Sequence, residues 1–284
     1  MVNQKLSFFN ENDGLIKKNI VLLMEKLMGV NKLNDLLLRI RSKGGYSNIG
    51  SGLVSFFKWD MKGVDTHFLT DNLKEGPLLI VANHPFGLPD GAMIAEEMKK
   101  HLGREDYKFF VGGVVTQIFP ELKENGFTVT NLKKDSFSKA GNIKTLISAR
   151  NHLKAGGMII MFPAGEVSGI RFKSERGIFK VCDFKWDESF HSLAKSSKAT
   201  ILPVHLGGRN SSVFLFWRFF GKMVGRMCLF REFVKLPSGK VVVSFRKPIT
   251  FLEHGSIPTK RFIRFVRTRI FKKVDLDKDC EPRP

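Results

Sequence analysis

The sequence predicts an α/β fold with a largely parallel central sheet flanked by helices on both faces, N-terminal amphipathic helices and a basic C-terminal helix. Short apolar segments, typical of parallel strands buried on both faces, alternate along the chain with segments of helical periodicity. Several strand candidates end in polar sequence that contains Gly and Pro. Because open α/β sheets bind their ligands at the carboxyl ends of the strands, this arrangement predicts a ligand site at one edge of the sheet.

The N-terminal part of the chain is predicted to be helical. Residues 14–41 place apolar side chains at three- and four-residue spacing with Lys and Arg between them, which predicts amphipathic helices. Two roles stay open for these helices: a cap on the domain, or a lid that lies on a membrane. A Gly- and Ser-rich break at 44–52 separates them from the first strand candidate at 55–61.

The rest of the chain alternates between strands and helices, and we expect it to form one domain, residues 46–274. An N-terminal helical segment, 1–45, precedes this domain, and a flexible tail, 275–284, follows it. The predicted strands are 77–83, 107–115, 157–165, 200–208 and 240–249, and the predicted helices are 91–101, 141–157, 184–198 and 258–273.

Composition excludes several classes of protein. The first residues lack the basic start and apolar stretch of a secretory signal, and no run of about 18 apolar residues occurs. We therefore expect a chain that is neither exported nor spans a bilayer. The three cysteines are odd in number and include no Cys-x-x-Cys pair, which predicts neither a disulfide framework nor a zinc site and favours a reducing compartment.

The formal net charge of +20 predicts contact with a polyanion, either nucleic acid or an anionic membrane. Sixteen Lys or Arg residues and only two acids lie between Arg209 and Lys273, where bulky apolar residues are interleaved with the cations. This composition is typical of helices in a lipid interface, and it also fits an ordinary helix with a core face and a basic solvated face. Because no known nucleic-acid-binding motif is present, we expect an anionic membrane surface, and no nucleic acid, as the partner.

Three motifs carry the functional information: VANHPFGLPDG at 81–91, FPAGEVSG at 162–169 and LPVHLGGRNS at 202–211. In this order they resemble motifs of the glycerolipid acyltransferase superfamily, over residues 75–250. The first motif of that superfamily is Asn-His followed by an Asp, its third reads like Phe-Pro-x-Gly, and its fourth holds a Pro inside an apolar strand. The sequences of these motifs look closest to those of a bacterial branch that includes lyso-ornithine lipid acyltransferases and hemolysin-like proteins.

The resemblance implies catalysis by His84 and Asp90. A neutral imidazole can take the proton of a lipid hydroxyl as its oxygen attacks a thioester carbonyl, and a carboxylate on the other ring nitrogen fixes the tautomer. Five residues separate His84 from Asp90, one more than in the commonest family pattern, and Gly87 and Pro89 are residue types that let a turn absorb the extra residue. The structural alternative is that Asp90 only caps the following helix.

The resemblance also implies a set of substrate-binding residues. Glu166 stands where the family places an acid at the acceptor site, and its alternative role is that of an acid in the first turn of a helix. Members that use phosphate-bearing acceptors usually carry an Arg soon after the motif Gly; it is missing here, and Arg171 or Arg209 could supply a cation instead. The predicted binding residues are Asn83, Gly87, Phe162, Pro163, Gly165, Glu166, Pro203 and Arg209.

The activity implied by the resemblance is transfer of a fatty acyl group from a thioester of acyl-carrier protein or coenzyme A to the hydroxyl of a lyso-lipid. The missing Arg favours an amino-acid-containing lyso-lipid, and the alternative acceptor is 1-acylglycerol-3-phosphate (lysophosphatidic acid). We expect no metal, no cofactor beyond the acyl thioester co-substrate, and a peripheral position at the cytoplasmic face of the membrane. A serine hydrolase is not predicted, because the sequence contains no Gly-x-Ser-x-Gly elbow.

Overall fold

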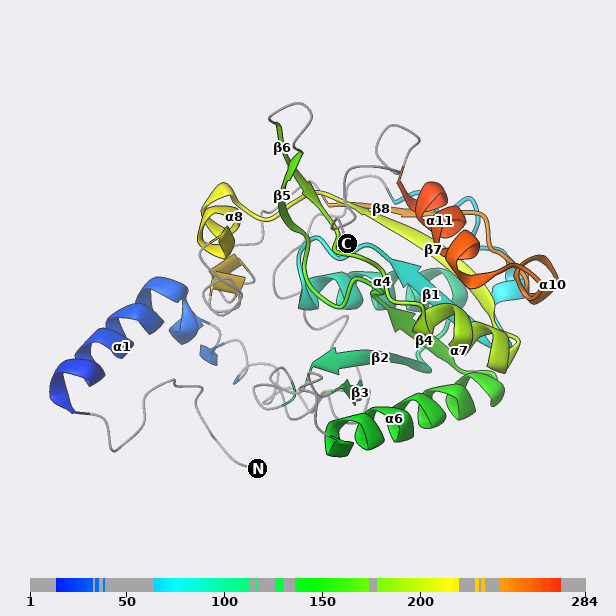
Figure 1. Ribbon diagram of the computed structural model, residues 1–284, viewed down its shortest axis with the longest axis horizontal. Helices are drawn as coiled ribbons and strands as arrows, with labels where there is room; N and C mark the ends of the chain where they lie inside the picture. The colour runs from blue at the N-terminus through cyan, green and yellow to red at the C-terminus, as the bar shows by residue number, and fades with distance from the viewer. Residues whose placement is uncertain are drawn as a thin grey trace.

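The computed structural model describes residues 14–32, 34, 35, 38, 64–112, 116, 126–129, 136–173, 178–219, 228, 229, 231, 232 and 241–271. Within these residues the α/β fold predicted from the sequence is confirmed (Figure 1). The predicted strand at 55–61 and the predicted tail at 275–284 lie outside the described residues.

The secondary structure follows the predicted alternation closely. The strands are β1 (Leu78–Ala82), β2 (Tyr107–Gly112), β3 (Gly126–Val129), β4 (Met158–Met161), β5 (Gly169–Lys173), β6 (Ile178–Cys182), β7 (Thr200–Gly207) and β8 (Val242–Phe245). The helices are α1 (Leu15–Met28), the short 3-10 helix η2 (Asp71–Leu73), α4 (Leu88–Leu102), α6 (Ser136–Lys154), α7 (Ser189–Ser197), α8 (Ser212–Phe219), α10 (Phe251–His254) and α11 (Thr259–Ile270).

Six strands form the central sheet in the order β3-β2-β4-β1-β7-β8. Its neighbouring strands pair in parallel, except that β8 runs antiparallel to β7. The strands β5 and β6 form a separate antiparallel hairpin, which the sequence pattern did not predict and which stands apart from the sheet in Figure 1. Cys182, the last residue of β6, is disulfide-bonded, which the number and spacing of the cysteines did not predict.

Helices cover both faces of the sheet, because alternate side chains of a strand point to opposite faces. Leu78 and Ile80 of β1 belong to a core that includes apolar residues of α4. Leu79 and Val81 belong to a second core with residues of α6, α7 and α11. All of β1 is buried, which explains why its sequence LLIVA is apolar throughout.

The register of the sheet brings the ends of three strands to one edge. Leu78 of β1 lies opposite Met158 of β4 on one side and Thr200 of β7 on the other, and both pairings are parallel. The segments that follow β1, β4 and β7 therefore emerge beside one another. These segments hold the three motifs that the sequence singles out.

The basic helix α11 is amphipathic, with one face buried in the core and the other exposed to solvent. Its apolar residues Phe262, Val266 and Ile270 are buried in the second core, whereas Lys260 and Arg264 are exposed. Of the two interpretations of this segment, the structure therefore shows a helix with a core face and a basic outer face. In the described part of the chain, no helix combines the length and the apolar character that a membrane span requires.

A buried histidine joins α7 to the beginning of α11. The ring nitrogens of His191 lie 3.2 Å from the hydroxyl of Thr259 and 3.3 Å from the carbonyl oxygen of His254, and the ring stacks on Phe262 at 4.2 Å between centroids. Burial lowers the pKa of His191 to about 4, and the positive charge of Lys195 acts in the same direction. The folded protein therefore keeps this side chain neutral near pH 7.

Acidification is expected to destabilise the fold through His191. Between pH 6.5, the ordinary pKa of histidine, and the pKa of about 4 in the folded protein, the unfolded chain binds a proton that the folded chain does not. The contribution of this residue to the free energy of unfolding should therefore fall by about 2 kcal/mol between pH 7.5 and pH 5. Urea unfolding of the wild-type protein and of His191→Gln at both pH values measures this difference.

The matched control is His67→Gln, because His67 is exposed. This variant should keep the full pH dependence of the wild-type protein, whereas His191→Gln should lose about 2 kcal/mol of it. If wild type and His191→Gln lost the same free energy between the two pH values, His191 would not be the titrating group.

Candidate active site

The turn between β1 and α4 carries the first motif. Helix α4 begins at Leu88 with Pro89 in its first turn, where a missing N–H costs no hydrogen bond, and Gly87 is its N-cap. Gly87 has a φ of 99°, a conformation that side chains with a Cβ rarely adopt, and a Cβ there would lie 3.3 Å from Val167. The turn between His84 and Asp90 therefore depends on a glycine at position 87.

His84 and Asp90 face each other across this turn. The Nδ1 atom of His84 lies 2.8 Å from Oδ2 of Asp90. The same carboxylate accepts the backbone N–H groups of Phe86 and Gly87, each at 3.0 Å. Asp90 therefore fulfils both interpretations of its position: it caps the first turn of α4, and it contacts the histidine.

The environment of the pair favours one tautomer of His84. Asp90 is fully buried, and desolvation raises its pKa, an effect that the hydrogen bond from His84 and the two backbone N–H groups opposes. With a proton on Nδ1 donated to the carboxylate, the neutral ring keeps Nε2 as a proton acceptor. The His84 side chain is 17% exposed and its ring stacks on Phe162 at 4.2 Å between centroids. The His84 ring is thus held at Nδ1 and on one face, and it stays partly open to solvent.

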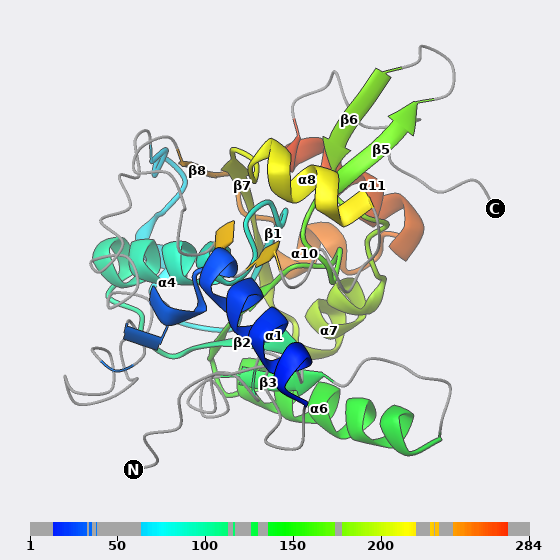
Figure 2. The same ribbon diagram turned by 90° about the vertical axis from the view of Figure 1, so that its left-hand side faces the viewer.

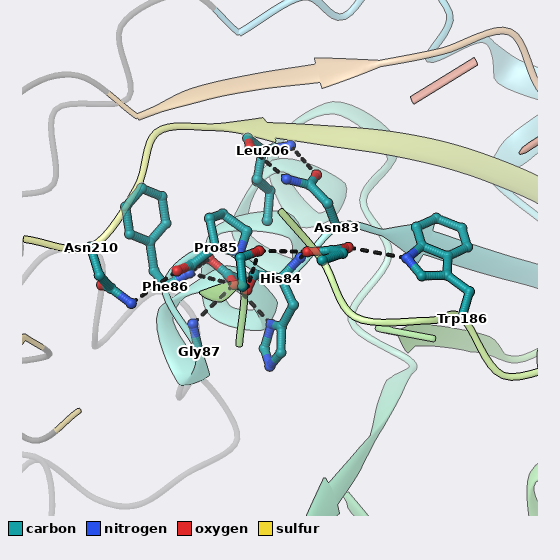
Figure 3. A network of polar contacts seen from close by, with 11 residues as sticks. Asn83, His84, Pro85, Phe86, Gly87, Trp186, Leu206 and Asn210 are labelled. Carbon is teal, nitrogen blue, oxygen red and sulfur yellow. Dashed lines mark hydrogen bonds and ion pairs between the residues drawn. The ribbon is translucent and has the colours of Figure 1, made fainter. Parts of the chain in front are cut away.

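Contacts from β7 and the loop after it hold the turn in place. The side-chain amide of Asn83 donates to the carbonyl of Leu206 at 2.8 Å and accepts the N–H of Leu206 at 2.7 Å, as Figure 3 shows. Asn210 donates to the carbonyl of Pro85 at 2.9 Å. Because its polar atoms pair with Leu206, Asn83 braces β1 against β7, and its role in substrate binding stays a prediction.

Gly208 lets the end of β7 approach this turn closely. Its φ is 125°, and a Cβ at this position would come within 2.4 Å of Cζ of Phe86. Any larger residue would force either the Phe86 ring or the backbone to move. The next residue, Arg209, is exposed at the same edge of the sheet.

The second motif lies directly against the first. Besides the stacking of Phe162 on His84, the N–H of Ser168 donates to the carbonyl of His84 at 2.8 Å. Between these two contacts the chain turns, with the N–H of Gly165 donating to the carbonyl of Phe162 at 2.9 Å. Glu166 is half-buried in this turn. Phe162 is thus the predicted binding residue whose side chain contacts the His84 ring.

Two proline residues of the predicted set support the backbone. The carbonyl of Pro163 accepts the N–H of Asp187 at 2.9 Å, and the carbonyl of Pro203 accepts the N–H of Arg246 at 2.9 Å. Pro203 is buried inside the sheet, in register with Val81 of β1. The structure therefore does not bring Pro203 to the surface on which His84 opens.

The structure adds residues that the sequence did not single out. Ser168 and Asp183 contact the backbone of His84, and Asn210 contacts Pro85. Ser168 and Asn210 lie inside motifs already noted, whereas Asp183 lies in a segment without a recognisable pattern. Among the described residues, no group of three or more His, Cys, Asp or Glu side chains could hold a metal ion.

Comparisons with known proteins identify the family of this chain. Residues 56–271 match the protein family described as Acyltransferase. The lyso-glycine lipid O-acyltransferase of Bacteroides thetaiotaomicron is 25% identical over 267 residues, which are 90% of this chain and 90% of that protein. The lyso-glycine lipid O-acyltransferase of Phocaeicola vulgatus is 26% identical over 208 residues, which are 70% of this chain and 65% of that protein.

One solved structure that matches the chain is the 1-acyl-sn-glycerophosphate (LPA) acyltransferase of Thermotoga maritima. The two chains superpose with a TM-score of 0.48 at 15% sequence identity, over 93% of this chain and 99% of that chain.

Replacing Asp90 by Asn should destabilise the protein and release the His84 ring. The amide nitrogen of Asn is a donor, so the buried N–H groups that now share the carboxylate lose an acceptor, at a cost of about 1–3 kcal/mol in the free energy of unfolding. The ¹⁵N chemical shifts of the His84 ring should change from one dominant tautomer to a mixture. Urea unfolding and NMR of labelled protein measure the two effects.

Asp71→Asn is the matched control, because the Asp71 side chain is 91% exposed and forms a surface ion pair with Lys74. It should change the free energy of unfolding by less than about 1 kcal/mol and leave the His84 signals unchanged. A single unshifted His84 tautomer in Asp90→Asn would show that Asp90 does not orient the ring.

Proposed function

This chain belongs to the acyltransferase family, and from this premise we propose that it transfers a fatty acyl group from a thioester donor to the hydroxyl of a lyso-lipid. The observation that carries the proposal is the 2.8 Å contact between His84 and a fully buried Asp90, which leaves Nε2 of the ring as the proton acceptor. The donor is the thioester of acyl-carrier protein or of coenzyme A.

In the proposed reaction His84 acts first as a base and then as an acid. Nε2 takes the proton of the lipid hydroxyl while the hydroxyl oxygen forms a bond to the thioester carbon. The resulting tetrahedral intermediate collapses, the carbon–sulfur bond breaks, and the sulfur leaves with the proton returned by the imidazolium. Asp90 stabilises the imidazolium between these steps. The attacking oxygen belongs to the substrate, so the reaction uses no covalent acyl-enzyme.

For the acceptor we propose an amino-acid-containing lyso-lipid. Two relatives carry the name lyso-glycine lipid O-acyltransferase. An N-acylated amino acid presents a carboxylate, and Arg209 is an exposed cation on the loop that adjoins the His84 turn through the contact of Gly208 with Phe86. Glu166, Val167 and Ser168 occupy the positions after Gly165 where a phosphate-binding member would carry Arg.

We further propose that the protein works as a peripheral enzyme on an anionic membrane, at the cytoplasmic face where its thioester donors occur. Helix α8 exposes Val213, Phe216 and Trp217 at 44%, 57% and 45%. Its buried residues Phe214 and Leu215 pack in one cluster with Val167 of the second motif, so the exposed side chains lie close to the site. Exposed apolar groups of this size suit a lipid interface.

Helix α1 supports the same orientation. It exposes four leucine side chains, and Figures 1 and 2 show it on the same side of the molecule as α8. The exposed leucines are Leu15, Leu22, Leu23 and Leu27. We therefore favour a membrane-lying role for this helix over that of a simple cap.

The direct test is an acyl-transfer assay with purified protein. Lyso-glycine lipid and lysophosphatidic acid are each supplied with acyl-carrier protein thioester and with coenzyme A thioester. We expect transfer to the amino-acid lyso-lipid, and a fall of about 10²- to 10⁴-fold in turnover in His84→Ala. His67→Ala, at an exposed histidine outside the site, should be unaffected.

Two outcomes would change the assignment. Undiminished turnover in His84→Ala would remove His84 from the mechanism. Transfer to lysophosphatidic acid alone would replace the proposed acceptor by the phosphate-bearing one while leaving the reaction type intact.

Membrane binding is tested with vesicles of anionic phospholipid. Binding should weaken with increasing salt, because screening shortens the range of charge attraction to about 8 Å at 0.15 M. Phe216→Ser with Trp217→Ser should weaken binding further and leave the free energy of unfolding unchanged, because both side chains are exposed. Ile143→Ser on α6 removes an equally exposed apolar side chain and is the control. Equal binding by wild type and the α8 variant would exclude α8 from the interface.

A further inference from the structure

A second buried carboxylate, that of Asp183, contacts His84 from the opposite side. Asp183 directly follows β6, lies 99 positions from His84 in the sequence and is 1% exposed. Its Oδ1 atom accepts the backbone N–H of His84 at 3.2 Å and the hydroxyl of Ser168 at 2.5 Å. Its Oδ2 atom accepts the indole N–H of Trp186 at 3.1 Å. Figure 3 shows the indole of Trp186 directed into this network.

Holding a carboxylate at this place is energetically demanding. Burial raises the pKa of Asp183, and the hydrogen bonds from Ser168, the His84 backbone and Trp186 oppose that shift. These three donors are a hydroxyl, an amide and an indole, all of them uncharged. A buried carboxylate often stabilises a fold no more than an apolar residue of the same volume would. We therefore relate Asp183 to the positions of the groups that donate hydrogen bonds to it, and not to stability.

The donors of Asp183 complete a clamp on His84. The N–H of His84 donates to Asp183 and its carbonyl accepts the N–H of Ser168 at 2.8 Å, so the backbone is held on both sides of the Cα atom. The ring is held at Nδ1 by Asp90 and on one face by Phe162. The contact with Asp90 can fix the orientation of the ring, but the position of the ring also depends on the position of the His84 backbone.

We propose that Asp183 is a positioning residue of the acyl-transfer reaction, which holds the peptide group of His84 so that Nε2 faces the incoming hydroxyl. The proposal rests on the proposed function of His84. Asp183 acts through His84 and Ser168 and contacts neither substrate. In this arrangement the β5–β6 hairpin and the loop after it belong to the catalytic apparatus, because they deliver Asp183.

Asp183→Asn tests the proposal with little change in volume. The variant keeps one acceptor oxygen and loses the charge that holds three donors, so we expect kcat to fall about 10- to 100-fold, the size of effect that a small misplacement of a reacting group produces. The KM for the lyso-lipid should stay within about 3-fold, because the acceptor site is untouched. An unchanged kcat, or a change confined to KM, would overturn the proposal.

Two further variants keep the test informative if Asp183→Asn folds poorly. Ser168→Ala removes one hydroxyl donor but keeps the N–H that contacts His84, and Trp186→Phe removes only the indole donor. Both should lower kcat, by less than Asp183→Asn does. Leu193→Ala, in the buried core of α7, lowers stability away from the site and should leave kcat per folded molecule unchanged. Full kcat in both Ser168→Ala and Trp186→Phe would contradict the clamp.

A double variant separates this proposal from the assignment of His84 itself. If Asp183 acts only through His84, adding Asp183→Asn to His84→Ala should lower the residual rate no further. A further fall would show that Asp183 acts elsewhere and would overturn the positioning role. Loss of activity in His84→Ala with full activity in Asp183→Asn would refute the role of Asp183 alone, whereas full activity in His84→Ala would refute the proposed function.

Discussion

The buried carboxylate of Asp90 is the constraint on which the rest of the site depends. A charge with no exposure to solvent persists only where donors surround it, and the donors available here are the ring of His84 and the first N–H groups before α4. Satisfying Asp90 therefore fixes the path of the turn, the start of the helix and the direction of the imidazole together. The parallel sheet then places the ends of β4 and β7 beside this turn, so that residues distant in sequence support it.

The sequence was informative where the relevant residues are close together or buried on both sides. The strands β1, β4 and β7 were predictable because strands covered by helices on both faces must be apolar throughout. The contact between His84 and Asp90 was predictable because the two residues lie only six positions apart, on one turn, whereas their catalytic role stays a prediction. The basic helix α11 was predictable as a helix, but an amphipathic pattern does not distinguish a lipid-facing side from a core-facing one.

Other parts were beyond the reach of sequence reasoning for physical reasons. The β5–β6 hairpin consists of two five-residue strands that, among the described residues, pair only with each other, so the pattern of the larger sheet gives no indication of it. In the sequence, nothing distinguishes Asp183 from an ordinary acidic residue in a loop, because the donors that it binds, the His84 N–H and the Ser168 hydroxyl, are distant in the chain. Asn83 was predicted to bind substrate, which stays a prediction, and the structure shows its amide hydrogen-bonded to the backbone of Leu206 in β7. A polar residue in a motif can thus stabilise the backbone around a site.

The limited exposure of His84 bears on the choice between transfer and hydrolysis. An unshielded imidazole near a thioester would activate water as readily as an alcohol, and the acyl group would be lost as free fatty acid. Here Phe162 covers one face of the ring and Asp90 occupies one of its nitrogens, so few orientations of a nucleophile remain. Water, which is in large excess over any lipid acceptor, meets the same restriction on its approach to the ring as the lipid hydroxyl does.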